Sequence, residues 1–346
     1  MAGLGDVTVN VLDGRDSIGG SKILVGWGGE GIFLDFGINY GHWGRYFEEY
    51  VKPRPAYGLA DLWKLGLVPR VENLYRRDII PAGLMRGGDL PVQKVMGVYV
   101  SHAHLDHGGL IGLLDPSIPM VSSRMSAAIL KAVQDSAPLS IFQQSVYSSP
   151  MKEDVVANQH VFRADSEKPL VGRNLFLTDG NGPASFGTFW SDPPTRPYLS
   201  KSKKPRQLLA GDIKMLQPSS GGVHATSHVV DHSVLGAAGY TIETPQGPVV
   251  YSGDIRSHGL HADESRAFLN SLERRRPWVL LMEGTQVRPD HQGDEAFSAA
   301  TTEQDVERNA LEAVERFRGK LVVADFGPRN IERLQSFLSI ARRTGR

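Results

Sequence analysis

The stretch Ser101-His102-Ala103-His104-Leu105-Asp106-His107 follows an apolar, strand-like run and determines what the rest of the chain has to match. His102 and His104 are two residues apart, so in extended backbone their side chains point to the same side and can share one metal ion. Asp106 and His107 follow where the chain turns, and they can address a second ion beside the first. Such a cluster directly after an apolar strand favours a metal site over a histidine-rich surface loop.

The residue types in this stretch also restrict the metal. The chain has no cysteine, so it forms no disulfide, and a metal must be held by His, Asp or Glu. Imidazole and carboxylate suit zinc or a similar borderline ion, whereas the thiolates of the usual structural zinc sites are absent. Gly108-Gly109 allows a close turn into a following helix.

Two later segments offer the further ligands that a hydrolytic metal site needs. Asp231-His232-Ser233 lies between two strand-like runs, and Gly253-Asp254 ends another. A carboxylate at such a strand end can bridge two ions and hold them roughly 3.5–4 Å apart. His258 and His261 lie just after Asp254, but each alone is more typical of a surface or core histidine than of a ligand.

Around these segments the pattern predicts a chain of many short strands. The 38 glycines and 21 prolines among 346 residues favour this over a helical bundle. Strands are predicted at 7–12, 21–25, 31–37, 95–100, 119–123, 222–228, 237–244, 248–252, 277–282 and 320–326. Helices are predicted at 59–65, 126–137, 302–317 and 330–343, the last with Asn330 as N-cap and Gly345 just past its end.

The organisation of the chain changes near residue 300. Before it, short strands dominate, and the first three predict an antiparallel meander. Residues 185–210 are rich in proline and are predicted to be a long connection. After residue 300, strand and helix alternate as in a βα unit. We therefore predict one domain over residues 1–300 and the start of a second over 301–346.

Charge and hydropathy indicate whether the protein would bind a polyanion or a membrane. Lys and Arg number 38, as do Asp and Glu, so no global charge attracts a polyanion. The local basic stretches, Arg76–Arg86 and Lys201–Arg206, are typical of solvated loops, with phosphate contact as the alternative. The first residues do not resemble a signal peptide, and no apolar run approaches the roughly 18 residues of a membrane helix. The sequence therefore predicts a soluble, cytoplasmic protein without a membrane partner.

The order of the motifs resembles the metallo-β-lactamase superfamily, with Asp35, His102-x-His104-x-Asp106-His107, His232 and Asp254 in sequence. Two phrases, Asp231-His232-Ser233-Val234 and Ser252-Gly253-Asp254-Ile255-Arg256, resemble more narrowly its β-CASP branch, which includes ribonuclease J. Met282-Glu283-Gly284-Thr285 fits the first signature of that branch. Residues 325–343 resemble the opening βα unit of its inserted β-CASP domain.

The resemblance implies an α/β fold and a set of site residues. The fold is an αββα sandwich with ligands along one edge, followed by the beginning of an inserted α/β β-CASP domain. Two Zn²⁺ ions are implied, with Mn²⁺ or Mg²⁺ as the alternatives. By the resemblance, His102, His104 and His232 would hold one zinc, and Asp106, His107 and Asp254 would hold the other, with Asp254 bridging the two. Asp35 and Glu283 would support these ligands.

The activity implied is metal-dependent phosphodiester hydrolysis of RNA in the manner of ribonuclease J, with Asp106, His232 and Asp254 as the catalytic residues. Water between the ions would attack phosphorus in line. DNA is the alternative partner, and a homo-oligomer is the alternative to a monomer. Hydrolysis of a small ester, thioester or lactam stays open, because one scaffold hosts many reactions. A non-catalytic subunit also stays open, although relatives of that kind usually lose ligands that are present here.

One departure from the family concerns the end of the chain. In the family, further histidine motifs follow the β-CASP insertion, whereas this sequence ends at Arg346 without a counterpart. We therefore expect either the N-terminal portion of a longer enzyme or a degenerate member, with the second metal weakly held.

Overall fold

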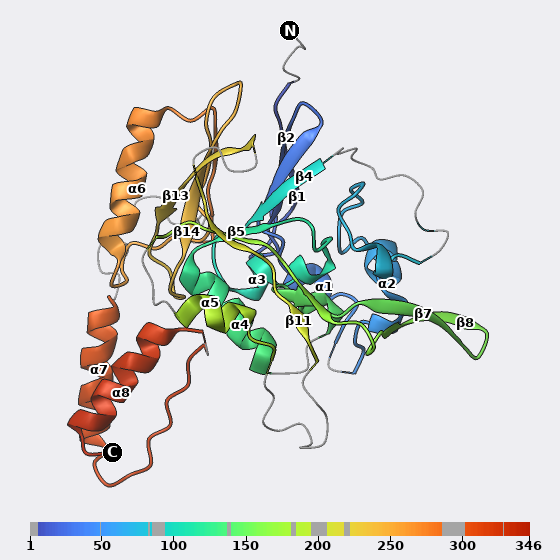
Figure 1. The fold of residues 1–346 in the computed structure, drawn as a ribbon. Helices are drawn as coiled ribbons and strands as arrows, with labels where there is room; N and C mark the ends of the chain where they lie inside the picture. The colour runs from blue at the N-terminus through green and yellow to red at the C-terminus, as the bar shows by residue number, and fades with distance from the viewer. Residues whose placement is uncertain are drawn as a thin grey trace.

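The computed structural model describes residues 6–48, 50–81, 84, 94–136, 140–180, 185–194, 206–217, 222–285, 302–327 and 329–346. Figure 1 shows two sheets near the middle of the molecule and helices around them. The helix pair at the end of the chain, α7 (Glu303–Arg316) and α8 (Ile331–Arg343), lies at one side.

The larger sheet has seven strands in the spatial order β1-β2-β3-β4-β5-β10-β12. They are β1 (Thr8–Asp13), β2 (Lys22–Trp27), β3 (Glu30–Leu34), β4 (Lys94–Tyr99), β5 (Met120–Ser122), β10 (Leu175–Leu177) and β12 (Ile213–Met215). The first three strands pair antiparallel, which confirms the predicted meander. The pairs from β3 to β12 are parallel, so the sheet is mixed.

The smaller sheet has four strands in the order β13-β14-β15-β16. They are β13 (His224–Val229), β14 (Ala238–Glu243), β15 (Val249–Tyr251) and β16 (Val279–Leu281). Two lesser groups complete the strands: β6 (Tyr147–Ser148), β9 (Leu170–Gly172) and β11 (Leu208–Leu209) form one, and the hairpin β7 (Met151–Val156) and β8 (Gln159–Ala164) forms the other.

The two main sheets pack face to face. Successive residues of a strand point to opposite faces, and in β3 both Ile32 and Phe33 are fully buried. Ile32 packs between the sheets in a cluster with Tyr240 and Val249 of the smaller sheet. Phe33 packs on the opposite face in a cluster with Leu130 of α4 (Arg124–Ser136). Burial on both faces explains why this strand is almost continuously apolar.

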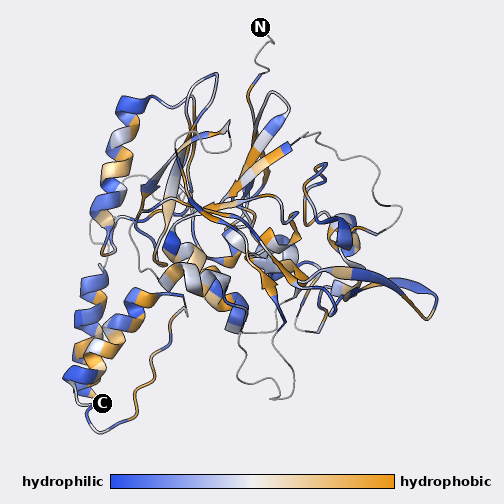
Figure 2. Cartoon of the chain, in the orientation of Figure 1, coloured by the Kyte–Doolittle hydropathy of each residue, from blue (hydrophilic) through white to orange (hydrophobic). Residues whose placement is uncertain are grey.

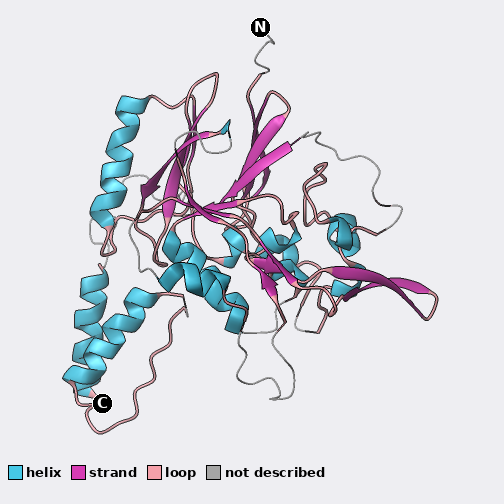
Figure 3. Ribbon diagram, in the orientation of Figure 1, coloured by secondary structure: helices cyan, strands magenta, loops and turns pink. Residues whose placement is uncertain are grey.

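Helices cover the outer faces, which gives the αββα layering expected (Figure 3). Helix α6 (Ala262–Arg275) covers the smaller sheet through Phe268, which packs with Val250. Figure 2 shows apolar residues gathered in the strands and hydrophilic residues along the outer helices. The remaining helices are α1 (Tyr40–Trp43), α2 (Ala60–Lys64), α3 (Leu105–Gly108) and α5 (Ser185–Ser191), with short 3-10 turns η1 (Pro55–Tyr57), η2 (Arg77–Ile79), η3 (Ile111–Leu113) and η4 (Ile141–Gln143).

The prediction of a strand at 320–326 is wrong. This segment pairs with no other described strand, and Leu321 and Val323 are 90% and 81% exposed. An apolar run becomes a strand only where a neighbour satisfies its backbone groups. The segment instead connects α7 to α8, so the predicted βα unit is a helix pair. Asn330 does cap α8, because its side chain accepts from the backbone N–H of Arg333, and Gly345 has a φ of +70° just past its end.

Two further expectations are affected by the structure. The stretch 185–210, predicted as a long connection, includes α5 and the short strand β11. The domain boundary near residue 300 falls in 286–301, outside the described residues, so the division into 1–300 and 301–346 stays a prediction. Among the described residues, no helix combines the length and the apolar character needed to cross a membrane.

Candidate metal centre

The histidine-dense stretch lies where β4 gives way to α3. His104 is the N-cap of α3 and has extended backbone, with φ −71° and ψ 153°. His102 and His104 therefore precede the helix, the latter with extended backbone, and Asp106 and His107 project from the first turn of the helix. This change of backbone conformation within six residues separates the two pairs of side chains, as the spacing predicts.

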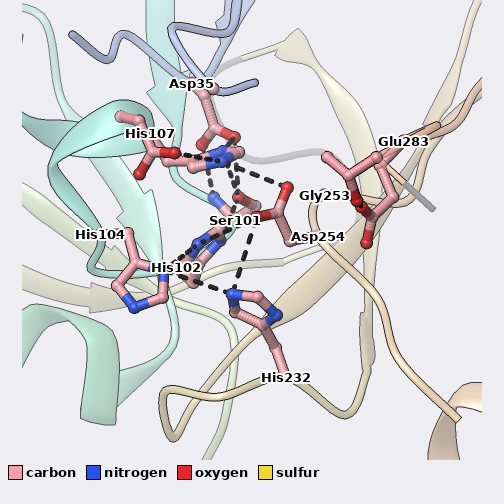
Figure 4. A network of polar contacts seen from close by, with 12 residues as sticks. Asp35, Ser101, His102, His104, His107, His232, Gly253, Asp254 and Glu283 are labelled. Atoms are coloured by element: carbon pink, nitrogen blue, oxygen red, sulfur yellow. Dashed lines mark hydrogen bonds and ion pairs between the residues drawn. The ribbon is translucent and has the colours of Figure 1, made fainter. Parts of the chain in front are cut away.

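Four side chains from three segments converge on one point (Figure 4). Each of His102, His104, His232 and Asp254 offers a ligand atom within 4.8 Å of the others. His104 Nδ1 lies 3.0 Å from His102 Nε2 and 3.2 Å from His232 Nε2. His232 follows β13 and Asp254 follows β15, so the smaller sheet supplies half of this group.

Asp254 also faces a second group. Its Oδ2 lies 3.8 Å from His102 Nε2 and 3.6 Å from His232 Nε2, while its Oδ1 lies 3.2 Å from His107 Nε2. Asp106 Oδ2 lies 3.9 Å from the same His107 nitrogen. The two carboxylate oxygens of Asp254 thus face two different sets of nitrogens, which is the arrangement that a bridging carboxylate requires.

The donor set fits divalent cations. His107 Nε2 is buried and has no hydrogen-bond partner among the described residues, although Asp106 and Asp254 lie close to it. A buried nitrogen without a hydrogen-bond partner is costly unless something binds it. Imidazole nitrogens and carboxylate oxygens in this number suit zinc and similar ions, and hard oxygen-loving ions less well.

The electrostatics of the first group also suit a cation. Burial lowers the pKa of His102 well below its ordinary value, and the imidazoles of His107, His232 and His104 lower it further. Burial lowers the pKa of His104 as well, and it lowers the pKa of His232 to about 4. These rings are therefore neutral at pH 7, which is the form that binds a metal.

His107 and Asp254 behave differently. Burial alone would lower the pKa of His107, but the carboxylates of Asp35 and Asp254 outweigh it and raise that pKa well above its ordinary value. Burial alone would raise the pKa of Asp254, but its contact with His107 outweighs burial and lowers it. Asp254 is therefore a carboxylate at neutral pH.

Asp35 supports the centre from behind. Its buried carboxylate accepts from His107 Nδ1 at 2.7 Å, from the backbone N–H of Ser101 at 2.7 Å and from the Ser101 hydroxyl at 2.7 Å. Its backbone has a φ of +57°, a conformation that most residues avoid and that Asp tolerates. The hydrogen bond on Nδ1 directs Nε2 of His107 toward the centre.

Two contributors to this support were not predicted from the sequence. The hydroxyl of Tyr251 donates to Asp35 Oδ2 at 2.6 Å, and Ser101 Oγ lies 2.9 Å from Nδ1 of His102. Tyr251 comes from β15 of the smaller sheet and Asp35 from the end of β3 of the larger. The only available signal was that each residue stands close to a ligand in the sequence.

Glu283 was expected to support the carboxylate network, and its contacts lie with the backbone beside Asp254. Figure 4 shows it apart from the rings, to one side of Asp254. Its carboxylate accepts from the backbone N–H of Ile255 and from the hydroxyl of Thr285. Glu283 therefore holds the chain directly after Asp254 and does not touch the ligand carboxylate itself.

Two of the basic side chains for which phosphate contact was the alternative, Arg76 and Arg206, are engaged elsewhere. Arg76 is 1% exposed, and its guanidinium binds Asp78 and the carbonyl of Ser149. Arg206 donates to the carbonyls of Lys168 and Asp165 and to the Ser149 hydroxyl. For these two residues the expectation of a free phosphate-binding cation is wrong. Arg77 is described and exposed, whereas Arg86 and residues 201–205 lie outside the described residues.

A cavity of about 560 Å³ opens beside the centre. Gly253, Asp254 and Glu283 line one side of it, and the glycine-rich turn at 14–19 lines another. Within that turn Arg15 pairs with Asp16, and both side chains are exposed.

Comparison with known proteins supports the fold. No protein-family model matches the chain, and no curated protein matches it. A protein of unknown function from Enterococcus faecalis V583 is similar in structure, with a TM-score of 0.59 and 22% identity over 98% of this chain and 64% of the other. This chain thus spans about two thirds of the length of that protein. At this identity the likeness concerns the fold alone.

Other solved neighbours include proteins named as metallo-β-lactamases and a lactone hydrolase. A metallo-β-lactamase from Cronobacter sakazakii has a TM-score of 0.34 and 12% identity over 94% of this chain and 82% of its own. An N-acyl homoserine lactone hydrolase, solved with its product at the catalytic metal centre, has a TM-score of 0.33 and 11% identity over 76% and 79%. What the larger likeness establishes is that this chain shares its mixed α/β fold with the Enterococcus protein.

Proposed function

We propose that this chain is a metal-dependent hydrolase whose centre is held by His102, His104, Asp106, His107, His232 and Asp254. The observation that carries the proposal is the position of Asp254, with one oxygen toward His107 and the other toward His102 and His232. A pair of divalent cations there would supply Lewis acidity and lower the pKa of bound water to near neutrality.

The chain's own residues would prepare the site for that chemistry. Asp35 fixes the ring of His107, and Ser101 lies against Nδ1 of His102, so both rings keep their orientation. His104, Asp106 and Asp254 are only partly buried. Substrate would therefore approach on the side of these three residues, while His102 and His107 form the buried wall.

For the substrate, we favour a small ester, thioester or lactam. The cavity beside Asp254 has the volume of a small-molecule site. Arg76 and Arg206, two of the basic residues considered for phosphate contact, are committed to internal contacts.

RNA phosphodiester hydrolysis, in the manner of the β-CASP branch, is the second candidate, with DNA as a variant of it. A specific observation favours it: Arg329, directly before α8, carries a positive charge near the centre. Burial is the main cause that lowers the pKa of His104, and the charge of Arg329 adds to it. Arg329 as a whole is only partly buried, so its positive charge would add to the attraction of an anionic substrate.

The test compares the protein with its His104→Ala variant on three substrates: an oligoribonucleotide, nitrocefin and a thioester. We expect the turnover of one of these substrates to fall about 100-fold or more in the variant. Removing a residue that only supports a metal ligand typically costs 10-fold to 100-fold, and removing a ligand should cost at least as much. His160→Ala is the matched control, because His160 is exposed on β8 and pairs with Glu153. Undiminished turnover in His104→Ala would refute the proposal, and less than one metal per chain would favour a non-catalytic subunit.

A further inference from the structure

Two charged residues lie beside metal ligands in the sequence without joining the ligand group. Asp231 directly precedes His232, and Arg256 follows Asp254 by two positions. Both belong to the motifs around the centre. Neither is among the side chains that converge on it.

Asp231 and Arg256 tie the two ligand-bearing loops to each other. Nε of Arg256 lies 3.1 Å from Oδ2 of Asp231, and Nη2 lies 3.2 Å from Oδ1. The backbone N–H of Arg256 also donates to the carbonyl of Asp231 at 2.9 Å. The Asp231 side chain is fully buried and that of Arg256 is 10% exposed. The backbone N–H of Gly259 donates to Asp231 Oδ2 as well, at 2.8 Å, so Asp231 joins the loop after β13 to the segment after β15.

The same guanidinium reaches the helix pair at the end of the chain. Nη1 lies 3.0 Å from Oε1 of Glu303 in α7, and Nη2 lies 2.8 Å from Oε2 of Glu332 in α8. Both carboxylates are at least nine-tenths buried. Nη2 of Arg333 in α8 lies 2.9 Å from Oε2 of Glu303 in α7, so Glu303 pairs with two arginines.

We propose that Arg256 is a positioning residue for the metal centre and couples the docking of the α7–α8 pair to metal binding. The inference rests on the proposed metal centre. Arg256 would act through the loops that carry His232 and Asp254, since its guanidinium binds Asp231, Glu303 and Glu332 and no ligand side chain.

The coupling follows from the chemistry of guanidinium. Its donors form a rigid planar fork, so all three nitrogens can hold their partners only in one placement of the loops and helices. If the helix pair leaves, Arg256 loses two of its three carboxylates and keeps only its pair with Asp231, so the ligand loops stay joined but the guanidinium holds them less rigidly. By linkage, metal binding must then favour docking to the same extent that docking favours metal binding.

The first measurement needs only the unaltered protein. Hydrogen–deuterium exchange in the segments 303–316 and 331–343 is compared with and without saturating zinc. We expect zinc to slow exchange there by roughly 5-fold or more, the size of an ordinary coupling between two sites. Equal exchange with and without zinc would overturn the coupling.

The second measurement is the zinc affinity of variants. Arg256→Met is expected to weaken it about 10-fold to 100-fold, and Arg256→Lys less, because lysine keeps the charge without the fork. Where Arg256→Met does not fold, the double variant Glu303→Ala/Glu332→Ala keeps the Asp231 pair and should still lose affinity. Arg266→Met, which removes an exposed pair with Asp263 in α6, is the control and should bind zinc normally.

The outcomes separate this inference from the proposed function. If the unaltered protein binds no zinc, the metal centre itself is refuted and the inference falls with it. If it binds zinc, and Arg256→Met and the double variant bind it equally well, the inference alone is overturned.

Discussion

At the scale of single residues, the centre depends on Asp35, a carboxylate that is not among the proposed metal ligands. Asp35 accepts hydrogen bonds from Ser101, His107 and Tyr251, and it is fully buried. Tyr251 comes from the smaller sheet, whereas Asp35 follows β3 of the larger. Asp35 therefore joins the two sheets directly behind the ligand rings.

The variant Asp35→Asn tests this role. Asn tolerates the positive φ of this position, so the backbone should not change. Its amide offers an NH₂ where Oδ2 now accepts from Tyr251, Ser101 and His107, and the orientation of His107 should be lost. We expect zinc affinity to fall about 10-fold to 100-fold and stability by about 1–3 kcal/mol. Zinc titration and urea unfolding measure both.

The control for this variant is Asp16→Asn, because Asp16 is exposed and pairs only with Arg15 in the described part of the chain. It should bind zinc with unchanged affinity. Normal zinc affinity in Asp35→Asn would mean that the rings hold their orientation without the carboxylate.

At the scale of elements, the site is assembled at the ends of strands. Asp35 follows β3, His102 follows β4, His232 follows β13 and Asp254 follows β15. The segment after β3 also runs against the ligand turn, where Phe36 N–H donates to the carbonyl of His107 and Ile38 N–H to that of Leu105. Strand ends of two sheets thus fix the ligand loops with backbone contacts as well as side chains.

The variant Gly37→Ala tests this close contact. A Cβ at Gly37 would lie 1.7 Å from the carbonyl oxygen of Asp106, so the turn carrying Asp106 and His107 would have to move. We expect a loss of about 3 kcal/mol in the free energy of unfolding, at the upper end for overpacking, together with weaker zinc binding. Gly187→Ala in α5 is the matched control, because a Cβ there meets nothing within 4 Å. That substitution should be neutral or stabilise by roughly 0.5–1 kcal/mol. Equal stability of the two variants, measured by urea unfolding, would contradict the proposed contact.

The same scale shows what sequence patterns can and cannot predict about elements. Strands such as β2 and β14 lie within about two residues of their predicted bounds, because alternating or continuous apolar residues end at turn residues. The hairpin β7–β8 was not predicted, since its strands are mostly exposed and its turn residues Ala157 and Asn158, with φ of 50° and 61°, lack the glycine that usually signals such a turn. The segment 320–326 has the apolar residues of a strand but no described neighbour.

At the scale of the whole molecule, local motifs and distant contacts differ in how well they can be predicted. The ligand group came from spacing within short motifs and from the resemblance that those motifs carry. The contacts of Asp35 with Tyr251 and of Arg256 with Glu332 join residues 216 and 76 positions apart. No periodicity in a sequence encodes such pairs, because they depend on how the sheets and the last two helices pack. The fold class could therefore be predicted, and the resemblance gave Asp35 and Glu283 as supporting residues, but their partners and the contacts of Arg256 could not be predicted.

Metal removal should destabilise the whole molecule, because the ligands come from both sheets. Anything that binds the folded state and not the unfolded one stabilises it by mass action, which amounts to about 2.7 kcal/mol at a ligand concentration 100 times the dissociation constant. For a chain of this size we expect zinc to raise the Tm of the EDTA-treated protein by roughly 5 °C, with a further rise as zinc increases. The variant Asp254→Asn should lose most of this rise, because its amide nitrogen cannot bind a cation in place of the oxygen that faces His107 or His232. His160→Ala should keep the rise, since that histidine lies on the exposed β8. Thermal unfolding with and without zinc measures this rise in Tm. An equal rise in Asp254→Asn and in the unaltered protein would mean that zinc binds elsewhere.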